Sequence, residues 1–295
     1  MVDAELQADV TDIQDHEGFL KGLLHDPVGV AGAIMIGLIL LAAVLGPLVA
    51  PHDPTMIYVD ARLAAPGGRF LLGADELGRD VLSRVLYGAR ISVQVGVTVV
   101  AFAGVIGVTI GLLAGFYRGW LDGILMRIMD SIFAFPTLLL ALAVIAVLGT
   151  ELRNLIAALV VVYVPAFARI ARSATLTVMQ EPYLEAARSL GARTRRLLIK
   201  HILPNIAAPV TVQFTIGLAY AILVEASLSY LGLGVQPPAA SWGSMLATGK
   251  PYIEFAPWVS LVPGFCIMFT VLGFNLLGDA MRDTLDPRLR TVQDG

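Results

Sequence analysis

The chain has 295 residues, of which 57% are hydrophobic and only 15% are charged, and its mean hydropathy is +0.79. Soluble domains carry about 25% charged residues, so this composition excludes an ordinary soluble globular protein and predicts a membrane protein. The single cysteine, Cys266, excludes an intrachain disulfide. The formal net charge of −3 says little, because the placement of charges along the chain matters more than their sum.

Six apolar segments approach the length that a helix needs to cross a bilayer core, which is roughly 20 residues. The acidic N-terminal segment lacks the basic start of a signal peptide, so we interpret residues 1–27 as a tail. The pattern predicts an all-α membrane protein with six transmembrane helices. In chain order these are residues 28–50, 91–117, 124–148, 155–170, 206–231 and 258–277.

The charges between the segments predict an orientation. An even number of spans puts both termini on one side of the membrane. If that side is the cytoplasm, thirteen of the 20 lysines and arginines are cytoplasmic, as the positive-inside rule favours. We therefore predict a multi-pass membrane protein with cytoplasmic tails at residues 1–27 and 281–295.

The first outer loop lies in the segment 28–90, which we separate from the core at residues 91–280. The alternation of apolar and polar residues at positions 75–90 of this loop predicts an interfacial helix that runs into the second span. The apolar face of this helix would carry Leu77, Val81, Leu82, Val85 and Leu86. The polar face would carry Glu76, Arg79, Asp80, Ser83 and Arg84. The helix is either a structural elbow or an element for gating or docking.

Small residues and prolines predict how the spans pack. Gly107, Gly111 and Gly115 recur every four residues, a spacing that lets two helix backbones approach closely. Prolines are expected to kink or end helices at three positions. These are Pro136, Pro165 and Pro209.

Residues 181–205 read EPYLEAARSLGARTRRLLIKHILPN and interrupt the apolar chain. Pro182 suits the first position of a helix, and Gly191 suits a left-handed helix cap. Thr194 is expected to cap a second helix, which Pro204 then ends. The segment therefore predicts a helix, a turn and a second helix. It either only joins two spans or enters a groove on another protein.

The sequence EAARSLG followed by LIKHILP resembles the EAA motif of ATP-binding-cassette importer permeases. The matching residues are Glu185, Ala186, Ala187, Gly191, Leu203 and Pro204. His201 within HILPN resembles the peptide and nickel branch. Residues 72–92, 225–246 and 275–290 resemble the second permease subunit of dipeptide and oligopeptide importers. The resemblance covers nearly the whole chain beyond the N-terminal tail.

The resemblance implies a type I importer permease fold and a function without covalent chemistry. Two different permeases would form the pore, two ATPases would bind ATP and Mg²⁺, and an external binding protein would deliver a peptide. This chain would lie in the lipid of a bacterial inner membrane, hold no cofactor or metal, and bind no nucleic acid. Residues 181–205, here called the EAA loop, would form a coupling helix seated in an ATPase. The coupling residues would be Glu185, Ala186, Ala187, Arg188, Leu190, Gly191 and Pro204.

Polar residues inside the predicted spans are candidates for the translocation path, because they are costly in lipid. They are Glu225, Gln213, Gln94 and Asn275. Glu225 either lines the cavity or ties helices together, and the three amides are expected to form hydrogen bonds between helices. Asp130 is expected to pair with Arg127 or Arg172. In the outer loop before the last span, Trp242 and Trp258 are interpreted as interface anchors.

Three other functions fit less well. A permease for nickel or another small solute shares the motifs and remains the main alternative. A transporter driven by an ion gradient would favour a cluster of buried carboxylates near the midplane, and only Glu225 and Asp130 are present. An intramembrane enzyme would need paired aspartates, a Ser with a His, or a zinc motif, and none of these occurs in the spans.

Overall fold

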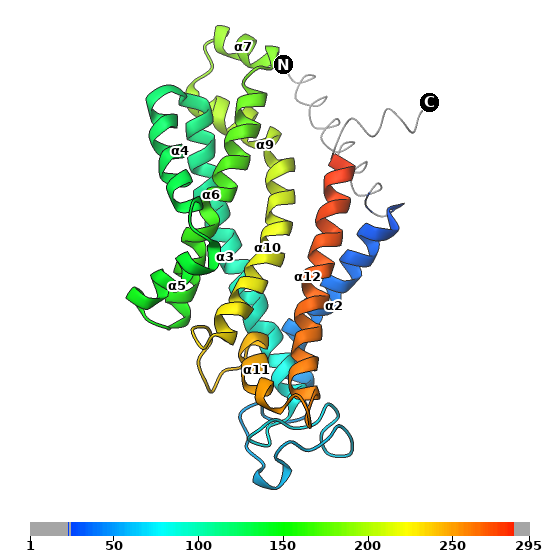
Figure 1. Ribbon diagram of the computed structural model, residues 1–295. Helices are drawn as coiled ribbons and strands as arrows, with labels where there is room; N and C mark the ends of the chain where they lie inside the picture. The colour runs from blue at the N-terminus through cyan, green and yellow to red at the C-terminus, as the bar shows by residue number, and fades with distance from the viewer. Residues whose placement is uncertain (1–22, 24, 286–295) are drawn as a thin grey trace.

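A computed structural model of the chain describes residues 23 and 25–285 (Figure 1). Most of the two predicted tails therefore lies outside the described residues. Five helices are each long and apolar enough to cross a membrane. They are α2 (Pro27–Val49), α3 (Val81–Tyr117), α6 (Leu152–Val178), α10 (Ala207–Tyr230) and α12 (Trp258–Leu285). The all-α membrane fold that the sequence predicts is confirmed.

The third predicted span is broken. It consists of α4 (Gly119–Phe133) and α5 (Thr137–Leu148), which meet at an angle of 91° and supply a sixth span when counted together. Pro136 lies at the break, where its missing N–H and its ring prevent a continuous helix. The kink at Pro136 is confirmed, whereas one continuous helix over 124–148 is wrong. Pro165 is accommodated inside α6.

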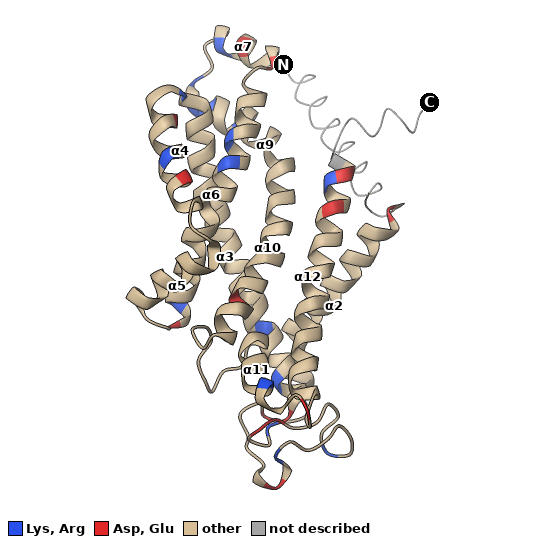
Figure 2. Cartoon of the chain, in the orientation of Figure 1, with Lys and Arg blue, Asp and Glu red and all other residues tan. Residues whose placement is uncertain are grey.

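The bundle has two distinct ends (Figure 1). The start of α2, the end of α12 and the short helix α7 (Pro182–Ser189) lie at one end, at the top of the view. The loop with η1 (Val59–Ala61), and α11 (Trp242–Gly249) with η3 (Lys250–Tyr252), lie at the other. Figure 2 shows charged residues gathered towards these ends, with few along the middle of the long helices.

Close packing of α3 on α6 forms the centre of the bundle. A Cβ added at Gly107 would lie 2.6 Å from the Val164 carbonyl oxygen, and one at Gly115 would lie 2.8 Å from Cβ of Thr175. These distances are too short for real side chains, so only glycine permits the two backbones to approach this closely. The close contact predicted from the glycine spacing is confirmed.

Replacing Gly111 with valine is therefore expected to destabilise the chain by about 1–3 kcal/mol, because the added carbons overlap the α6 backbone at Ala168. Thermal unfolding of the purified protein in detergent measures the loss. Gly37→Val is the control, since a Cβ at Gly37 in α2 meets nothing within 4 Å. Equal unfolding temperatures for the two variants would show that the α3–α6 contact is not tightly packed.

The interfacial helix predicted over 75–90 is wrong in its start and in its polar face. Residues before Val81 form a turn, and the helix that begins there runs unbroken into the second span. Asp75 accepts the backbone N–H groups of Leu77 and Arg79 and pairs with the Arg79 guanidinium, Nε to Oδ2 at 2.7 Å. Arg84 lies 3.3 Å from the same carboxylate oxygen.

These contacts explain why charged residues that were expected to face water are buried. A carboxylate with two guanidinium partners and two backbone donors stabilises a turn more than a helix at the same residues. Asp80 then caps α3 by accepting the N–H of Ser83. Burial raises the pKa of the neighbouring Glu76, and the Asp75 carboxylate raises it further.

The loop before α12 contains the short helix α11, which packs against α10 and α3. Trp242 is 1% exposed, and its Nε1 donates to the Val85 carbonyl at 3.1 Å. A Cβ at Gly243 would lie 2.6 Å from Cα of Ala226, so α11 packs directly on the α10 backbone. The interpretation of Trp242 as an interface anchor is wrong, because its ring lies in the core.

Candidate functional site

The EAA loop begins with α7, which is held to the bundle by one face. Pro182 occupies the first helical position, as predicted. Leu184 is 2% exposed and belongs to a cluster with Ala171, Leu197 and Ile202. These contacts anchor α7 on α6 and on the second half of the loop, so α7 has a defined position relative to the membrane-spanning helices.

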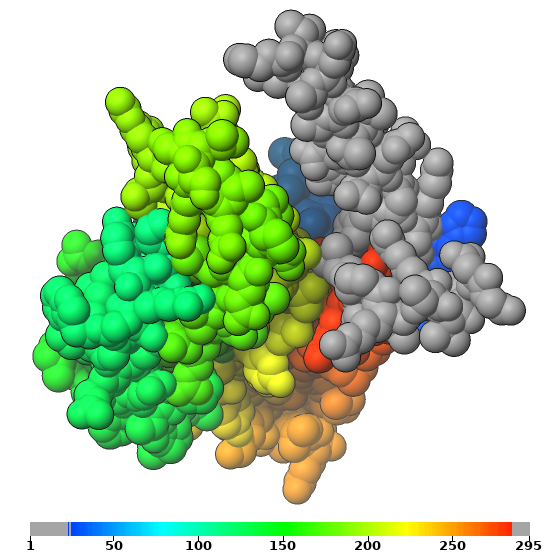
Figure 3. Space-filling model, turned by 90° about the horizontal axis from the view of Figure 1, so that it is seen from above, coloured from blue at the N-terminus to red at the C-terminus, as the bar shows by residue number. Residues whose placement is uncertain are grey.

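The opposite face of α7 is mostly open to solvent in the described part of the chain, where Arg188 contacts Met179 and the Phe116 ring. Glu185, Ala186 and Arg188 are exposed, and Leu190 directly after the helix is 88% exposed. Figure 3 looks onto this end of the molecule and shows the lime-green loop residues on the surface. An exposed leucine beside small and charged residues is typical of a surface that another protein covers.

The turn after α7 follows the predicted cap. Gly191 has a φ of +80°, a left-handed conformation that favours glycine. Its N–H donates to the Arg188 carbonyl at 2.9 Å, and the Ala192 N–H donates to the Ala187 carbonyl at 3.0 Å. The left-handed cap at Gly191 is confirmed, and it fixes the angle at which α7 leaves the second half of the loop.

The second half of the loop differs from the prediction. Arg193 precedes the helix with no side-chain cap, and Thr194 is its first residue rather than its cap. The helix continues through α8 (Thr194–Arg196), the π-helical segment η2 (Leu197–Ile202) and α9 (Leu203–Asn205), so Pro204 does not end it. The wider π turns directly before Pro204 accommodate a residue that has no N–H to donate.

The two halves of the loop enclose a cationic pocket of about 500 Å³. No ion pair with a described residue neutralises the cations of the loop. The pocket is lined by Ala187, Leu190, Gly191, Ala192, Arg193, Arg196 and His201. Figure 2 shows blue residues on and below α7. Such a surface can accept acidic or polar groups of a partner protein, and it holds no set of side chains for covalent chemistry.

Glu225 is the second feature of interest, and it is completely buried. Ser229 donates to its Oε1 at 2.7 Å, and Ser92 of α3 donates to its Oε2 at 3.3 Å. Ser241, the N-cap of α11, also lies near this carboxyl group. The carboxyl group thus joins α3 and α10 beside the start of α11, and the described residues enclose it completely. The geometry favours the helix–helix tie over the cavity-lining role.

The three amides do not lie in one cluster with Glu225. Gln94 is exposed, and Gln213 and Asn275 are partly exposed. None of them forms a side-chain hydrogen bond with a described residue, so the expected interhelical hydrogen bonds are absent from this part of the chain. Sequence reasoning missed Ser92, Ser229 and Ser241, although the four-residue spacing of Glu225 and Ser229 was a usable signal.

Ion pairs near the α7 end join α4 to α6. Asp130 accepts from Nη2 of Arg169 at 2.7 Å, so the expected partners Arg127 and Arg172 are wrong. Arg172 instead pairs with Asp122, Nη2 to Oδ2 at 2.6 Å. Both pairs hold α4 against α6, which is one of the two helices of the central contact.

Comparison with known proteins identifies the family. Residues 107–291 match the family described as "Binding-protein-dependent transport system inner membrane component". Residues 18–66 match "N-terminal TM domain of oligopeptide transport permease C". Together the two matches cover most of the chain, including the EAA loop and Glu225.

Relatives from several bacteria are similar over almost their whole length. The dipeptide transport system permease protein of Alkalihalophilus pseudofirmus is 42% identical over 92% of this chain and 89% of its own. The di/tripeptide permease of Pseudomonas aeruginosa is 44% identical over 93% and 92%. The glutathione permease of Pectobacterium atrosepticum is 43% identical over 92% and 91%.

A solved structure of the MetNI methionine ABC transporter in an inward-facing conformation shares the fold. One of its chains aligns with a TM-score of 0.55 and 20% identity, over 68% of this chain and 95% of that chain. With the family match over more than half of the chain, the findings show that this protein belongs to the binding-protein-dependent inner membrane components, the non-catalytic permease subunits of ATP-binding-cassette importers.

Proposed function

We propose that the chain forms half of the pore of an ATP-driven importer of dipeptides or oligopeptides. A second, different permease subunit forms the other half, two ATPases bind ATP and Mg²⁺ beneath the pair, and an external protein delivers the peptide. The α7 end of the bundle is cytoplasmic, as are both termini. The relatives named as peptide and glutathione permeases support the substrate class.

The observation that carries the coupling role is the outward face of α7. It is exposed, carries Glu185 and Arg188, and belongs to a helix whose opposite face is anchored by Leu184. A rigid element fixed to two spans on one face and to a motor on the other transmits motion between them. In this assignment Ala186 and Ala187 keep the helix thin enough to enter the ATPase, and Gly191 and Pro204 shape the segment that leads into α10.

A reconstitution experiment tests the whole function. The chain, the second permease and both ATPases are placed in proteoliposomes with the loaded binding protein. We expect uptake of a labelled dipeptide that requires ATP and the binding protein. Uptake of nickel instead of peptide would support the alternative substrate. Uptake by this chain alone, driven by an ion gradient, would contradict the proposal.

Cross-linking tests the docking site directly. Cys266 is first replaced with serine, and a single cysteine is placed at Ala186, which is exposed on α7. We expect a bifunctional reagent to join it to an ATPase subunit. Gly123→Cys on α4 is the control, since Gly123 is also exposed but lies outside the loop. A cross-link from the control position but none from Ala186→Cys would exclude α7 as the docking helix.

A further inference from the structure

One face of α10 is exposed or only partly covered by the rest of the described chain, and it carries more polar side chains than the exposed faces of α2 and α12. Its residues recur at spacings of three and four, as one side of a helix requires. They are Gln213, Ile216, Tyr220, Leu223, Ser227 and Tyr230, all exposed or partly exposed. Four of these six carry an amide or a hydroxyl group. We call this set the α10 stripe.

The exposed faces of α2 and α12 provide the comparison. On α2 the large exposed side chains include Ile34, Leu38, Leu41, Val44 and Leu48. On α12 they are Leu261, Phe265, Met268 and Leu272. These faces suit lipid, which offers no hydrogen bonds to amides or hydroxyls. The amide and hydroxyl groups of the α10 stripe are therefore better suited to a surface that water and polar solutes can reach.

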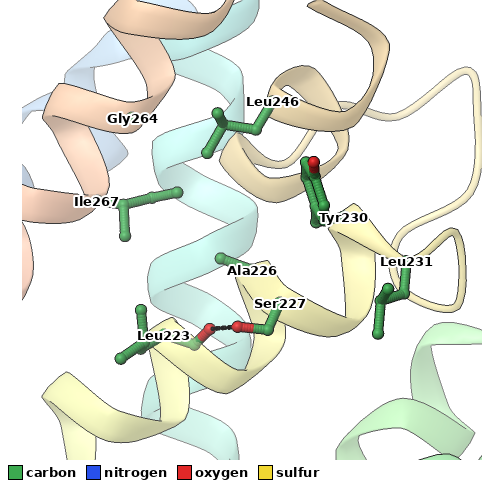
Figure 4. Close-up of a pocket in the computed structure, with 8 residues that line it drawn as sticks. All are labelled: Leu223, Ala226, Ser227, Tyr230, Leu231, Leu246, Gly264 and Ile267. Atoms are coloured by element: carbon green, nitrogen blue, oxygen red, sulfur yellow. Dashed lines mark hydrogen bonds between the residues drawn. The ribbon is translucent and has the colours of Figure 1, made fainter. Parts of the chain in front are cut away.

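A pocket of about 360 Å³ lies at the outer end of the stripe (Figure 4). Its walls are apolar except for Ser227 and Tyr230, and the Ser227 hydroxyl donates to the Leu223 carbonyl at 2.8 Å. Three helices contribute the lining, which is Leu223, Ala226, Ser227, Tyr230, Leu231, Leu246, Gly264 and Ile267. Pockets of this size, apolar with a few polar groups, are typical of small-ligand sites.

The positively charged side chain of Lys250 lies beside Tyr230, which forms part of the pocket wall. Nζ of Lys250, in η3, lies 5.4 Å from the centre of the Tyr230 ring. Lys250 is exposed and forms no ion pair with a described residue. A hydrogen bond with the Tyr230 hydroxyl raises the pKa of Lys250. An apolar pocket and an exposed ammonium group therefore meet at one aromatic ring.

A short peptide presents the complementary pair at its C-terminal end, where an apolar side chain and a carboxylate are attached to one carbon. We propose that this pocket binds the C-terminal residue of the peptide during translocation, with its side chain against Leu223, Leu246 and Ile267 and its carboxylate towards Lys250. The proposal rests on the proposed function and adds a specificity site in the permease itself. Lipid and the second permease are the competing occupants.

The stripe favours a peptide over both competitors. An acyl chain would match the apolar walls but would leave the Tyr220 hydroxyl and the Gln213 amide facing hydrocarbon. A helix of the second permease packed along the stripe would bury the same groups, neither of which forms a side-chain hydrogen bond with a described residue. A peptide in water satisfies them, and its own amides can exchange hydrogen bonds with them as it moves along α10.

Filling the pocket tests the side-chain contact. A Cβ at Gly264 would meet only Cδ2 of Leu246, at 3.9 Å, so Gly264→Val fits and reduces the free volume. Uptake of alanyl-leucine and alanyl-glycine is measured in the complete reconstituted importer with saturating loaded binding protein. We expect Gly264→Val to lower alanyl-leucine uptake roughly tenfold more than alanyl-glycine uptake. The binding protein has its own preference between the two dipeptides, but the same binding protein is used throughout. Its preference therefore cancels when the ratio of the two uptake rates is compared between each variant and the wild type.

Gly37→Val is the matched control, because it adds the same atoms to an open position on α2. It should leave the ratio of the two uptake rates unchanged. Lys250→Gln tests the charge and should lower uptake of both dipeptides roughly tenfold, since both carry the carboxylate. Lys250→Arg keeps the positive charge and should restore most of the uptake.

Each alternative occupant has its own result. Loss of the second permease from purified Gly264→Val complexes would identify a subunit interface, and dependence of the Lys250→Gln defect on anionic lipid would identify a lipid site. Either result would overturn the proposal, as would equal loss of both dipeptides in Gly264→Val. A wild-type importer that takes up no peptide would overturn the proposed function itself, whereas these other results leave it intact.

Discussion

Glu185→Lys is expected to lower ATP-driven peptide uptake by the assembled importer about 10- to 100-fold, the range of a typical coupling free energy between two sites. Glu185 lies on the exposed face of α7, and no contact in the described chain depends on its charge. The variant should therefore fold normally and still fail to transmit ATPase closure. Uptake and ATP hydrolysis are measured on the same proteoliposomes, and hydrolysis should no longer respond to the loaded binding protein.

Asp283→Lys is the control for this result, because it makes the same charge change at an exposed position near the end of α12. It should retain wild-type uptake. Gly191→Pro tests the turn in a second way, since proline fixes φ near −65° and cannot adopt the +80° of Gly191. Normal stimulated hydrolysis and uptake in both loop variants would disprove the assignment of the EAA loop as the coupling element.

Glu225→Leu is expected to destabilise the chain by about 2–4 kcal/mol, because it leaves the hydroxyls of Ser92 and Ser229 without their shared acceptor in the interior. Glu225→Gln retains an acceptor oxygen and should cost far less. Thermal unfolding of the purified complex in detergent gives the comparison, and the leucine variant should unfold several degrees lower than the glutamine variant.

The position of α11 provides an independent readout of the same tie. Ser241 precedes α11 and Glu225 lies in α10, so loss of the carboxyl group should loosen the segment that Trp242 holds against α3. A cysteine at Thr248, which is exposed on α11, should then react faster with a water-soluble thiol reagent. Glu151→Ala is the stability control, because the Glu151–Arg153 pair is largely exposed. If Glu225→Leu behaves like this control, Glu225 does not tie the helices.

Local signals in the sequence predicted much of the fold. The lengths of the apolar segments predicted the spans, and the glycine spacing on α3 predicted its close contact with α6. Pro182 and Gly191 predicted the start of α7 and the turn that follows it. Each of these depends on residues within a few positions of one another. Backbone conformation and helix periodicity act over the same short range, so one sequence is sufficient to read them.

The hydrogen-bond and ion-pair partners of polar side chains could not be predicted from the sequence in the same way. Ser92 and Glu225 are 133 positions apart, and Asp130 finds Arg169 rather than its neighbour Arg127. The turn at Asp75 shows the same limit, because the buried Arg84 that pairs with it belongs to α3. Burial of a charge becomes favourable only when a partner from elsewhere in the chain is present.

By itself, the sequence determined that this protein crosses a membrane as helices and carries an EAA loop that resembles those of importer permeases. Only the tertiary structure decided that Glu225 is a tie, that the helix passes Pro204 through a π segment, and that Lys250 stands beside an apolar pocket. The physical reason is the distance along the chain over which each property is decided. Hydrophobic length and backbone preference are properties of a segment, whereas the environment of a polar side chain is created by segments that meet only after folding.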